Sequence, residues 1–488
     1  MVKRVVHKNI VLLIVAIAQF MVVLDSSIVN VALPSMYKAL GFTSTDSLQW
    51  VITAYTLAFG GFLLLGGRAA DLYGRKRVFI ASTALFALVS LAAGLAQNSL
   101  MIDITRAIQG LAAAFMSPAA LSIILTTFKE GKERASALSI WGAVAAGGAA
   151  VGVLLGGVLT EYLDWRWNFF VNVPVGIAVA IAAYRYVPES KADLDHSKLD
   201  LPGAVLVTSG LMLLVFAFTK APSYGWSSWE AIRLFGASAL LLGTFLWNEA
   251  RSKHALMPLN IFKIRNVASA NLAQLPITAA MFSMFFFVTL YVQNILGYTP
   301  VQSGLSFLPI TFVIGGISVL MQHVIGRIGY KKPLVVAPLL IALGLFLLSG
   351  FEVGGNYWTD VFPGLITMAA GMGMTFISIT IAATTGVPPR ESGLASGLLN
   401  TSQQIGGALG LAILSGVATS GAGQYVNDHL KPGVDDVLLT MQSQVAGFSD
   451  ALHVGIAFAI ASSVVAFFFI HEKPGEIIDP EAAVTAAG

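Results

Sequence analysis

The sequence predicts an all-α integral membrane protein with fourteen transmembrane helices, and three observations favour this fold class. Of the 488 residues, 56% are hydrophobic and only 11% are charged, against about a quarter charged in soluble domains. Apolar stretches of roughly 18 or more residues recur from one end of the chain to the other, and each can cross a bilayer as a helix. Basic residues cluster in alternate loops. Transmembrane strands would alternate polar and apolar residues over about ten positions, and no such alternation dominates here.

We expect the spans near residues 10–33, 48–66, 77–96, 100–123, 136–160, 168–187, 201–219, 231–249, 268–292, 302–323, 333–351, 361–384, 393–415 and 451–470. A cleaved signal peptide is the alternative for the first stretch. That stretch is too long for a signal peptide, contains Asp25, and ends at Pro34 without a small-residue cleavage site. We therefore expect it to remain as the first helix.

The distribution of basic residues predicts the orientation in the membrane. With these spans, 22 of the 28 Lys and Arg residues lie on the side of the N-terminus, five lie on the other side, and Arg106 lies within a span. Lys and Arg concentrate in cytoplasmic loops. We therefore expect a multi-pass protein of the cytoplasmic membrane with both termini in the cytoplasm.

Two loops resemble one another at an offset of about 255 residues. Leu72–Arg77, after the second expected helix, reads LYGRKR, and Arg327–Lys332, after the tenth, reads RIGYKK. This offset fits two six-helix halves related by a pseudo-two-fold axis and separated by an inserted helix pair, with domains at 1–190, 191–266 and 267–488. Parallel repeats of this kind are typical of transporters whose central site lies between two halves that rock.

Ionisable residues inside the expected spans indicate the chemistry. A lone carboxylate such as Asp25, about two thirds of the way along the first helix, is costly by a few kcal/mol unless it faces water, finds a partner or takes up a proton. Arg106 lies at a similar depth in the fourth helix, so movement of the pair would change how readily Asp25 binds a proton. A static ion pair is one alternative, and a structural carboxylate satisfied by Ser26 and Ser27 is another. Asp103, one turn before Arg106, is a second candidate partner of the arginine.

The loop between the second and third helices, Gly67–Arg77, combines glycines with a dense set of charges. It resembles the GxLaDrxGrkr signature of the major facilitator superfamily. Ala69 stands in place of the usual Leu of that signature, and Leu72 stands in place of the usual Arg. The residues that match are Gly67, Asp71, Gly74, Arg75 and Lys76.

The resemblance implies an inner gate at this loop. In that family the acid is thought to meet the N-terminal dipole of a helix in the opposite half, which by repeat position is the start of the thirteenth helix, near Ser392 and Gly393. The tendency of positive charge to stay in the cytoplasm would explain the arginines of the loop. It would not explain Asp71 between two glycines.

Three further motifs resemble those of the fourteen-helix drug/proton antiporters. Leu24–Pro34 is similar to that family's first-helix motif, Trp165–Pro174 to its junction of helices 5 and 6, and Arg106–Gly110 to its helix 4 motif. The Arg of the helix 4 motif is assigned to proton coupling in that family. The resemblance covers almost the whole chain and implies the major facilitator fold, with proton coupling by Asp25 and Arg106 and with Asp103 as a further candidate.

The fifth expected helix is rich in glycine, which lets a neighbouring helix approach closely. Gly148, Gly152, Gly156 and Gly157 resemble the GPxxGG antiporter motif, which in that family belongs to exporters. Val153 stands where the motif has Pro. This departure weakens the argument for export, and close packing alone is the alternative explanation of the glycines.

Substrate contacts follow only from which helices line the cavity in relatives, and aromatic residues on a span more often pack or face lipid. The expected lining residues are Asn30, Trp50, Tyr55, Gln109, Phe282, Phe285, Phe286, Asn400, Gln403 and Gln404. The expected partners are a small-molecule substrate, protons and the lipid bilayer. We expect no nucleic acid and a monomer.

The sequence also argues against several classes of function. It has no P-loop, which excludes ATP as the energy source, and no cysteine, which excludes disulfides and thiolate metal sites. We expect neither a cofactor nor a metal, and the intramembrane charges are too sparse for an enzyme. The resemblance thus predicts a proton-coupled exporter that expels amphipathic or cationic small molecules by alternating access. A dedicated exporter of one metabolite, siderophore, antibiotic or lipid on the same fold is the first alternative, and a passive channel is another.

Overall fold

The computed structural model describes residues 8–42, 45–128, 132–191, 199–252, 255–388, 392–429 and 436–472, and within these ranges every regular element is a helix. The α-helices are α1 (Lys8–Leu40), α2 (Thr45–Leu48), α3 (Trp50–Tyr73), α4 (Arg75–Gly94), α5 (Ser99–Thr127), α6 (Lys132–Tyr162), α7 (Trp167–Phe170), α8 (Asn172–Tyr186), α9 (Leu201–Tyr224), α10 (Trp229–Arg251), α11 (Arg265–Leu290), α12 (Pro300–Ile328), α13 (Lys331–Leu348), α14 (Phe362–Thr384), α15 (Ser392–His429) and α16 (Asp436–Phe469). Tighter or wider helical turns lie at η1 (Leu259–Lys263), η2 (Tyr291–Ile295) and η3 (Tyr357–Val361).

The long helices have the length and composition of membrane spans. Within the described ranges, thirteen helices are long and apolar enough to cross a bilayer. Another long helix, α6, has 31 residues, of which Gly147–Tyr162 form a shorter apolar stretch. Each expected span coincides with one of these helices, and the sixth is formed by α7 and α8 together. The prediction of an all-helical membrane protein is confirmed.

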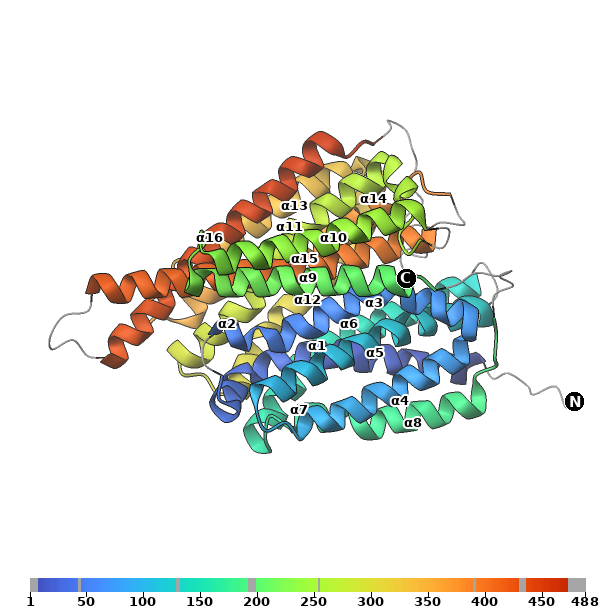
Figure 1. The fold of residues 1–488 in the computed structure, drawn as a ribbon, viewed down its shortest axis with the longest axis horizontal. Coiled ribbons are helices and arrows are strands. Elements are labelled where there is room, and N and C mark those ends of the chain that lie inside the picture. Colours follow the sequence, from blue (N-terminus) through green and yellow to red (C-terminus); the bar gives the residue numbers. More distant parts are fainter. Residues whose placement is uncertain are drawn as a thin grey trace, which may run out of the picture.

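The helices form two groups, α1–α8 and α11–α16, with α9 and α10 beside them (Figure 1). In the first group α1 packs on α6, and α5 packs on both α3 and α4. In the second group α11 packs on α15 and α16, and α13 packs on α14 and α16. Helix α9 contacts α10, α3 and α15, so the inserted pair lies against both groups. The start of α1 and the end of α16 lie at the same end of the bundle, which we call the termini face.

The two related loops have the same local structure. Gly74 follows α3 with a φ of 106°, and Gly329 follows α12 with a φ of 79°, both in the region that favours glycine. Glu189 accepts a hydrogen bond from a backbone N–H in the first turn of α4 at 3.2 Å, and Glu472 accepts one just before α13 at 3.0 Å. A carboxylate stabilises a helix N-terminus. The repeat seen in the sequence therefore includes a capping glutamate that the sequence analysis did not predict.

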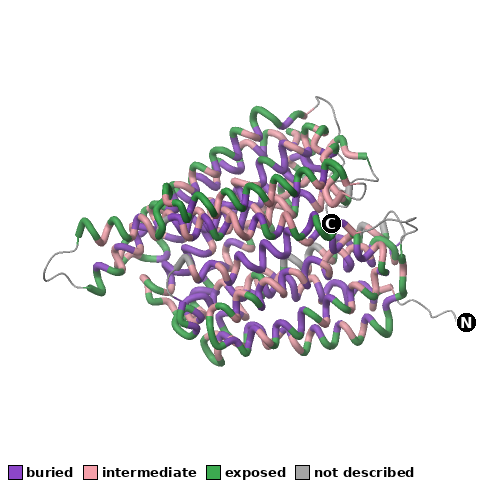
Figure 2. The backbone as a smooth tube through the Cα atoms, in the orientation of Figure 1, coloured by how far each residue is buried: buried purple, intermediate pink, exposed green. Residues whose placement is uncertain are grey.

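On the face opposite the termini face, the two groups are joined. Glu161, at the end of α6, accepts a hydrogen bond from Val301 N of α12 at 2.9 Å. Gln293 of η2 donates to the backbone oxygen of Val31 in α1 at 2.9 Å. Buried residues, purple in Figure 2, continue from one group into the other, and one apolar cluster contains residues of both. Toward the termini face, α13 and α14 diverge from α4 and α8 (Figure 1).

Helices α15 and α16 are longer than predicted. The expected spans 393–415 and 451–470 are parts of helices of 38 and 34 residues. At 1.5 Å per residue, α15 is about 57 Å long, nearly twice the apolar thickness of a bilayer. The two expected spans leave residues 416–450 between them as an outer loop, and that expectation was wrong, because most of this segment is a helical hairpin that protrudes opposite the termini face (Figure 1). The run Lys431–Gly433, which reads KPG and predicts a turn, lies outside the described residues.

Candidate proton-coupling site

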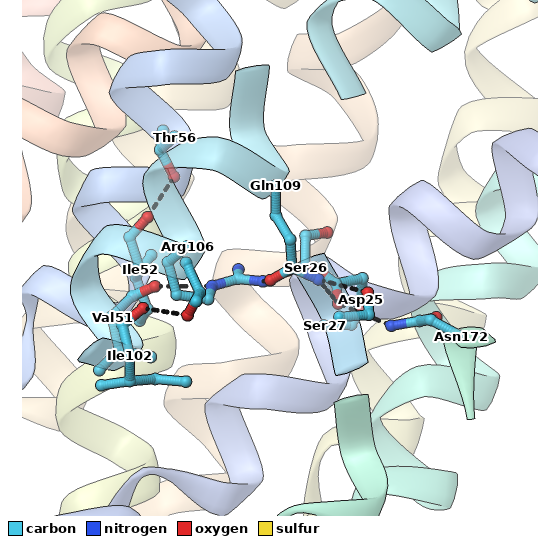
Figure 3. Close-up of polar contacts among 12 residues, drawn as sticks. Asp25, Ser26, Ser27, Val51, Ile52, Thr56, Ile102, Arg106, Gln109 and Asn172 are labelled. Carbon is cyan, nitrogen blue, oxygen red and sulfur yellow. Dashed lines mark hydrogen bonds and ion pairs between the residues drawn. The ribbon is translucent and has the colours of Figure 1, made fainter. Parts of the chain in front are cut away.

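A buried ion pair lies within the first helix group (Figure 3). Arg106 Nη1 of α5 donates to Asp25 Oδ2 of α1 at 2.5 Å. Asp25 is fully buried and Arg106 is 1% exposed. Removing one partner of such a pair typically costs about 3–5 kcal/mol, because the other charge stays buried without a counter-ion. Ser26 and Ser27 do not satisfy Asp25, since both hydroxyls donate to the backbone oxygen of Val23.

Two amide side chains complete the hydrogen bonding of Asp25 (Figure 3). Asp25 Oδ1 accepts from Gln109 Nε2 at 3.2 Å and from Asn172 Nδ2 at 2.8 Å. Gln109 also accepts from Arg106 Nη1 at 2.9 Å and donates to Ser90 Oγ of α4 at 2.7 Å. All five side chains are at most 1% exposed. The network therefore joins α1, α4, α5 and α8, and the side-chain contacts to Asp25 are all hydrogen-bond donors.

The Arg106–Gly110 segment folds so that the arginine is fixed between two helices. Gly110 lies against α3, where a Cβ would be 2.2 Å from Tyr55 O, so only glycine permits this approach. The approach lets Arg106 Nε donate to Val51 O at 2.9 Å and places the guanidinium carbon 4.3 Å from the centre of the Tyr55 ring. A desolvated cation over an aromatic ring gains about 2 kcal/mol. Helix α3 thus holds one side of the guanidinium, and Asp25 holds the other.

Protonation of Asp25 requires this network to rearrange. An ionised carboxylate only accepts hydrogen bonds, whereas a protonated carboxyl group also donates one. Of the two amide groups on Asp25, Gln109 already uses its oxygen to accept from Arg106, whereas Asn172 Oδ1 is buried without a partner in the described part of the chain. Rotation of the Asn172 amide would turn this oxygen toward Asp25 as the acceptor that a protonated carboxyl group needs. The site therefore supports one hydrogen-bonding pattern for each protonation state.

Other residues do not lie where the sequence analysis placed them relative to the coupling site. Asp103 lies outside the network, and its buried Oδ1 has no hydrogen-bond partner among the residues described. Arg106 instead pairs with Asp25. Gln109, expected in the substrate cavity, is fully buried beside the ion pair. Asn172 was not predicted as a site residue, although it belongs to the junction motif Trp165–Pro174, which was the available signal.

The charged loop on the termini face pairs within its own half. Arg75 Nη2 donates to Asp71 Oδ1 at 2.9 Å, and Lys76 Nζ donates to a backbone oxygen of α8 at 2.8 Å. Gly67 faces α5. At the start of α15, Gly393 is exposed, and a Cβ there would meet nothing within 4 Å. Among the described side chains, Asp71 thus pairs with Arg75 and not with Gly393. Helices α3 and α15 nevertheless pack on each other at Leu64 and Gly397.

The glycines of α6 divide between two neighbours. Gly148, Gly152 and Gly156 lie against α1, and a Cβ at Gly156 would be 2.7 Å from a backbone oxygen of that helix. Gly157 faces α12 of the other group, where a Cβ would be 2.6 Å from a backbone oxygen. The row therefore holds α1, which carries Asp25, directly against the helix that joins the two groups.

The residues expected to line a substrate cavity fall into two sets. One set, Tyr55, Gln109 and Phe286, is packed, with at most 4% exposure. The other set is half-buried or exposed and consists of Asn30, Trp50, Phe282, Phe285, Asn400, Gln403 and Gln404. Within that second set, Trp50 packs on the inserted helix α9, with its ring centroid 6.3 Å from that of Phe216. Phe285 likewise packs on Phe307 of α12, with ring centroids 5.7 Å apart, and Phe282 lies against Gly407 of α15. The polar members on α1 and α15 are therefore the better candidates for substrate contact.

A bundle of long apolar helices in two repeated groups, with a buried ion pair inside one group, defines a membrane transporter built from two halves. The chain belongs to the Major Facilitator Superfamily, whose family model matches residues 15–411. It is 39% identical over 465 residues to the puromycin resistance protein pur8 of Streptomyces alboniger, across 95% of this chain and 91% of that protein. It is 40% identical over 429 residues to the cephamycin export protein CmcT of Amycolatopsis lactamdurans, across 86% of this chain and 87% of that protein.

A solved structure shares the fold. The crystal structure of a bacterial homologue of the human lysosomal transporter Spinster, in an inward-facing and occupied conformation, matches with a TM-score of 0.66 and 15% identity, across 94% of this chain and 96% of that chain. The predicted major facilitator fold is confirmed. The relatives are resistance and export proteins of this superfamily, so the resemblance to its drug antiporters is confirmed as well.

Proposed function

We propose that the chain is a proton-coupled exporter that expels amphipathic or cationic small molecules across the cytoplasmic membrane by alternating access. The observation that carries this proposal is Asp25, a carboxylate buried in the spanning part of a transporter and bound by Arg106, Gln109 and Asn172. A charge at such a depth is expensive and is typical of proton relays. The names of the two relatives, one for puromycin resistance and one for cephamycin export, support antibiotic-like cargo.

In the proposed cycle, the termini face is cytoplasmic and both termini lie in the cytoplasm. The contacts between α6 and α12 then close the outer side, and substrate enters from the cytoplasm between the halves, near Asn30 and Asn400. The ionised Asp25 paired with Arg106 corresponds to the state that has released its proton and binds substrate. After reorientation, a proton from outside neutralises Asp25, frees Arg106 and drives the return.

The predicted inner gate and domain division also fit this cycle. Asp71 reaches the start of α15 only when the termini face closes, so the inner gate forms in the outward-facing state. We propose that the halves comprise 1–190 and 267–488, that 191–266 forms the inserted pair with its flanking loops, and that one chain is the working unit. Transport, not catalysis, is the proposed activity, and its partners are protons, a small-molecule substrate and the bilayer.

Transport into everted membrane vesicles tests the function. We expect uptake of puromycin and of a cationic dye such as ethidium when a proton gradient is imposed, and loss of that uptake when an ionophore collapses the gradient. Uptake that continues after the ionophore would contradict proton coupling and favour a passive channel. Uptake confined to one compound of a broad panel would favour the dedicated exporter, which the name of the cephamycin export relative also supports.

A further inference from the structure

A second pair of carboxyl groups lies outside the Asp25 network, at the termini face of the inserted helix pair. Asp200 precedes α9, and Glu249 lies in the last turn of α10. Asp200 is 7% exposed and Glu249 is 3% exposed. One oxygen of each group approaches Gly203, where a Cβ would lie 2.6 Å from Asp200 Oδ2 and 2.8 Å from Glu249 Oε1. The missing side chain at Gly203 lets the two buried carboxyl groups meet.

The hydrogen bonds of the pair leave one oxygen of Glu249 facing Asp200. Asp200 accepts from Gly203 N at 2.9 Å and from Asn248 Nδ2 at 2.9 Å, which satisfies it as the cap of α9. Glu249 Oε2 accepts from Met257 N at 2.7 Å. Glu249 Oε1 is buried, has no donor among the residues described, and lies beside Asp200 Oδ2 against Gly203. Burial disfavours the charged form of Glu249, and the nearby Asp200 carboxyl disfavours it further.

Two carboxyl groups form a hydrogen bond only when one of them carries a proton. Two carboxylates held together in a buried place repel each other, and one proton removes that repulsion. Among the described residues, no basic side chain forms an ion pair with Asp200 or Glu249, and Asp200 is the charged group that acts on Glu249. Arg251, at the end of α10, lies over the ring of Trp247 at 4.6 Å. A shared proton is therefore the partner that this geometry calls for.

We propose that Asp200 and Glu249 form a proton-binding site that holds one proton between them, and that this proton fastens residues 255–264 to the end of the inserted pair. The fastening runs through the hydrogen bond from Met257 N to Glu249. When the proton leaves, Glu249 swings away from Asp200 and the anchor of Met257 is lost.

The segment 255–264 connects this site to the junction of the halves. Its Ile261 belongs to a buried apolar cluster with Ala395 and Leu398 of α15, and Leu64 of α3 packs on the same cluster. Release of the segment therefore loosens packing where α3 of one half meets α15 of the other. Packing at that junction therefore responds to the proton concentration at the termini face. This inference does not depend on whether the protein exports drugs.

Infrared difference spectroscopy of the purified protein tests the proton directly. We expect a carbonyl band of a protonated carboxyl group that disappears as the pH rises, and we expect Glu249→Gln and Asp200→Asn each to abolish it. Asp25→Asn is the control, because that residue lies outside the site, and it must leave this band in place. A band that survives in both site variants, or no such band in the parent protein, would overturn the proposal.

Thiol labelling tests whether the shared proton holds residues 255–264 against the inserted pair. The labelling has no background because the chain has no cysteine. The variant Met257→Cys is compared with Ile328→Cys, whose position is 43% exposed at the end of α12, so that the ratio of the two maleimide labelling rates cancels the titration of the thiol. We expect this ratio to rise with pH in the parent and to stay constant in Glu249→Gln, an isosteric change that keeps the pair at the single negative charge of its protonated form. An equal rise in the Gln variant would show that the segment moves independently of the shared proton.

Discussion

Replacing Asp25 by Asn removes the charge of the buried carboxylate and keeps its size. The amide can still accept from Asn172, but Arg106 loses its counter-ion while only 1% exposed. An unpaired charge at such a place costs about 3–5 kcal/mol. We therefore expect a lower thermal unfolding temperature in detergent, together with loss of gradient-driven puromycin uptake in everted vesicles, because the variant cannot take up the proton.

The double variant Asp25→Asn, Arg106→Met separates the two effects. Met fills much of the space of Arg without a charge, and replacing both partners of a buried pair by uncharged groups is often close to neutral. Most of the lost stability should therefore return while uptake stays absent. If the pair only ordered the helices, restoring stability would restore uptake.

The control for this experiment is Asp103→Asn, which removes a carboxyl group of α5 outside the network. This variant should keep gradient-driven uptake. Undiminished gradient-driven uptake by Asp25→Asn, at a normal amount of protein in the membrane, would refute the role of Asp25 as the proton carrier.

Two further predictions concern packing and closure. Gly110→Ala should lower stability by roughly 1–3 kcal/mol, because its Cβ would lie 2.2 Å from Tyr55 O, whereas Gly147→Ala, which meets nothing within 4 Å, should not; equal thermal unfolding of the two would contradict the close approach. Cysteines at Glu161 and Val301, joined by a short bifunctional maleimide, should stop uptake because the α6–α12 contact can then no longer open. Full uptake by the cross-linked protein would contradict alternating access.

The membrane fold could be predicted because a bilayer leaves the chain few options. Every backbone polar group in lipid must be paired within the protein, so each long apolar stretch becomes a helix. Hydropathy marks only the part of a helix that lies in lipid, and for this reason the ends of α15 and α16 were mistaken for a loop. Outside the membrane, contacts such as the hydrogen bond from Tyr425 to Gln442 support the hairpin, and a reading of apolar stretches does not register them.

The ion pair could be predicted because two opposite charges at similar depth in a membrane attract each other and tend to pair. The positions of the two amide side chains around Asp25 could not be predicted in this way. Asn172 lies at the start of α8, and its side chain reaches Asp25 because α8 packs on α1, a tertiary contact that the sequence pattern does not give. The contact of Asp71 with the start of α15 was predicted from a family signature, whereas in this structure Asp71 pairs with Arg75.

The most direct test of the central claim is to measure protons released when substrate binds to the purified protein. A pH indicator in weakly buffered detergent solution reports the release, and the titrant is a compound that the vesicle assay shows to be transported. If Asp25 is the proton carrier, substrate binding releases a proton from the wild-type protein and none from Asp25→Asn. Equal release from both proteins, or binding to the wild type with no release at any pH, would contradict it.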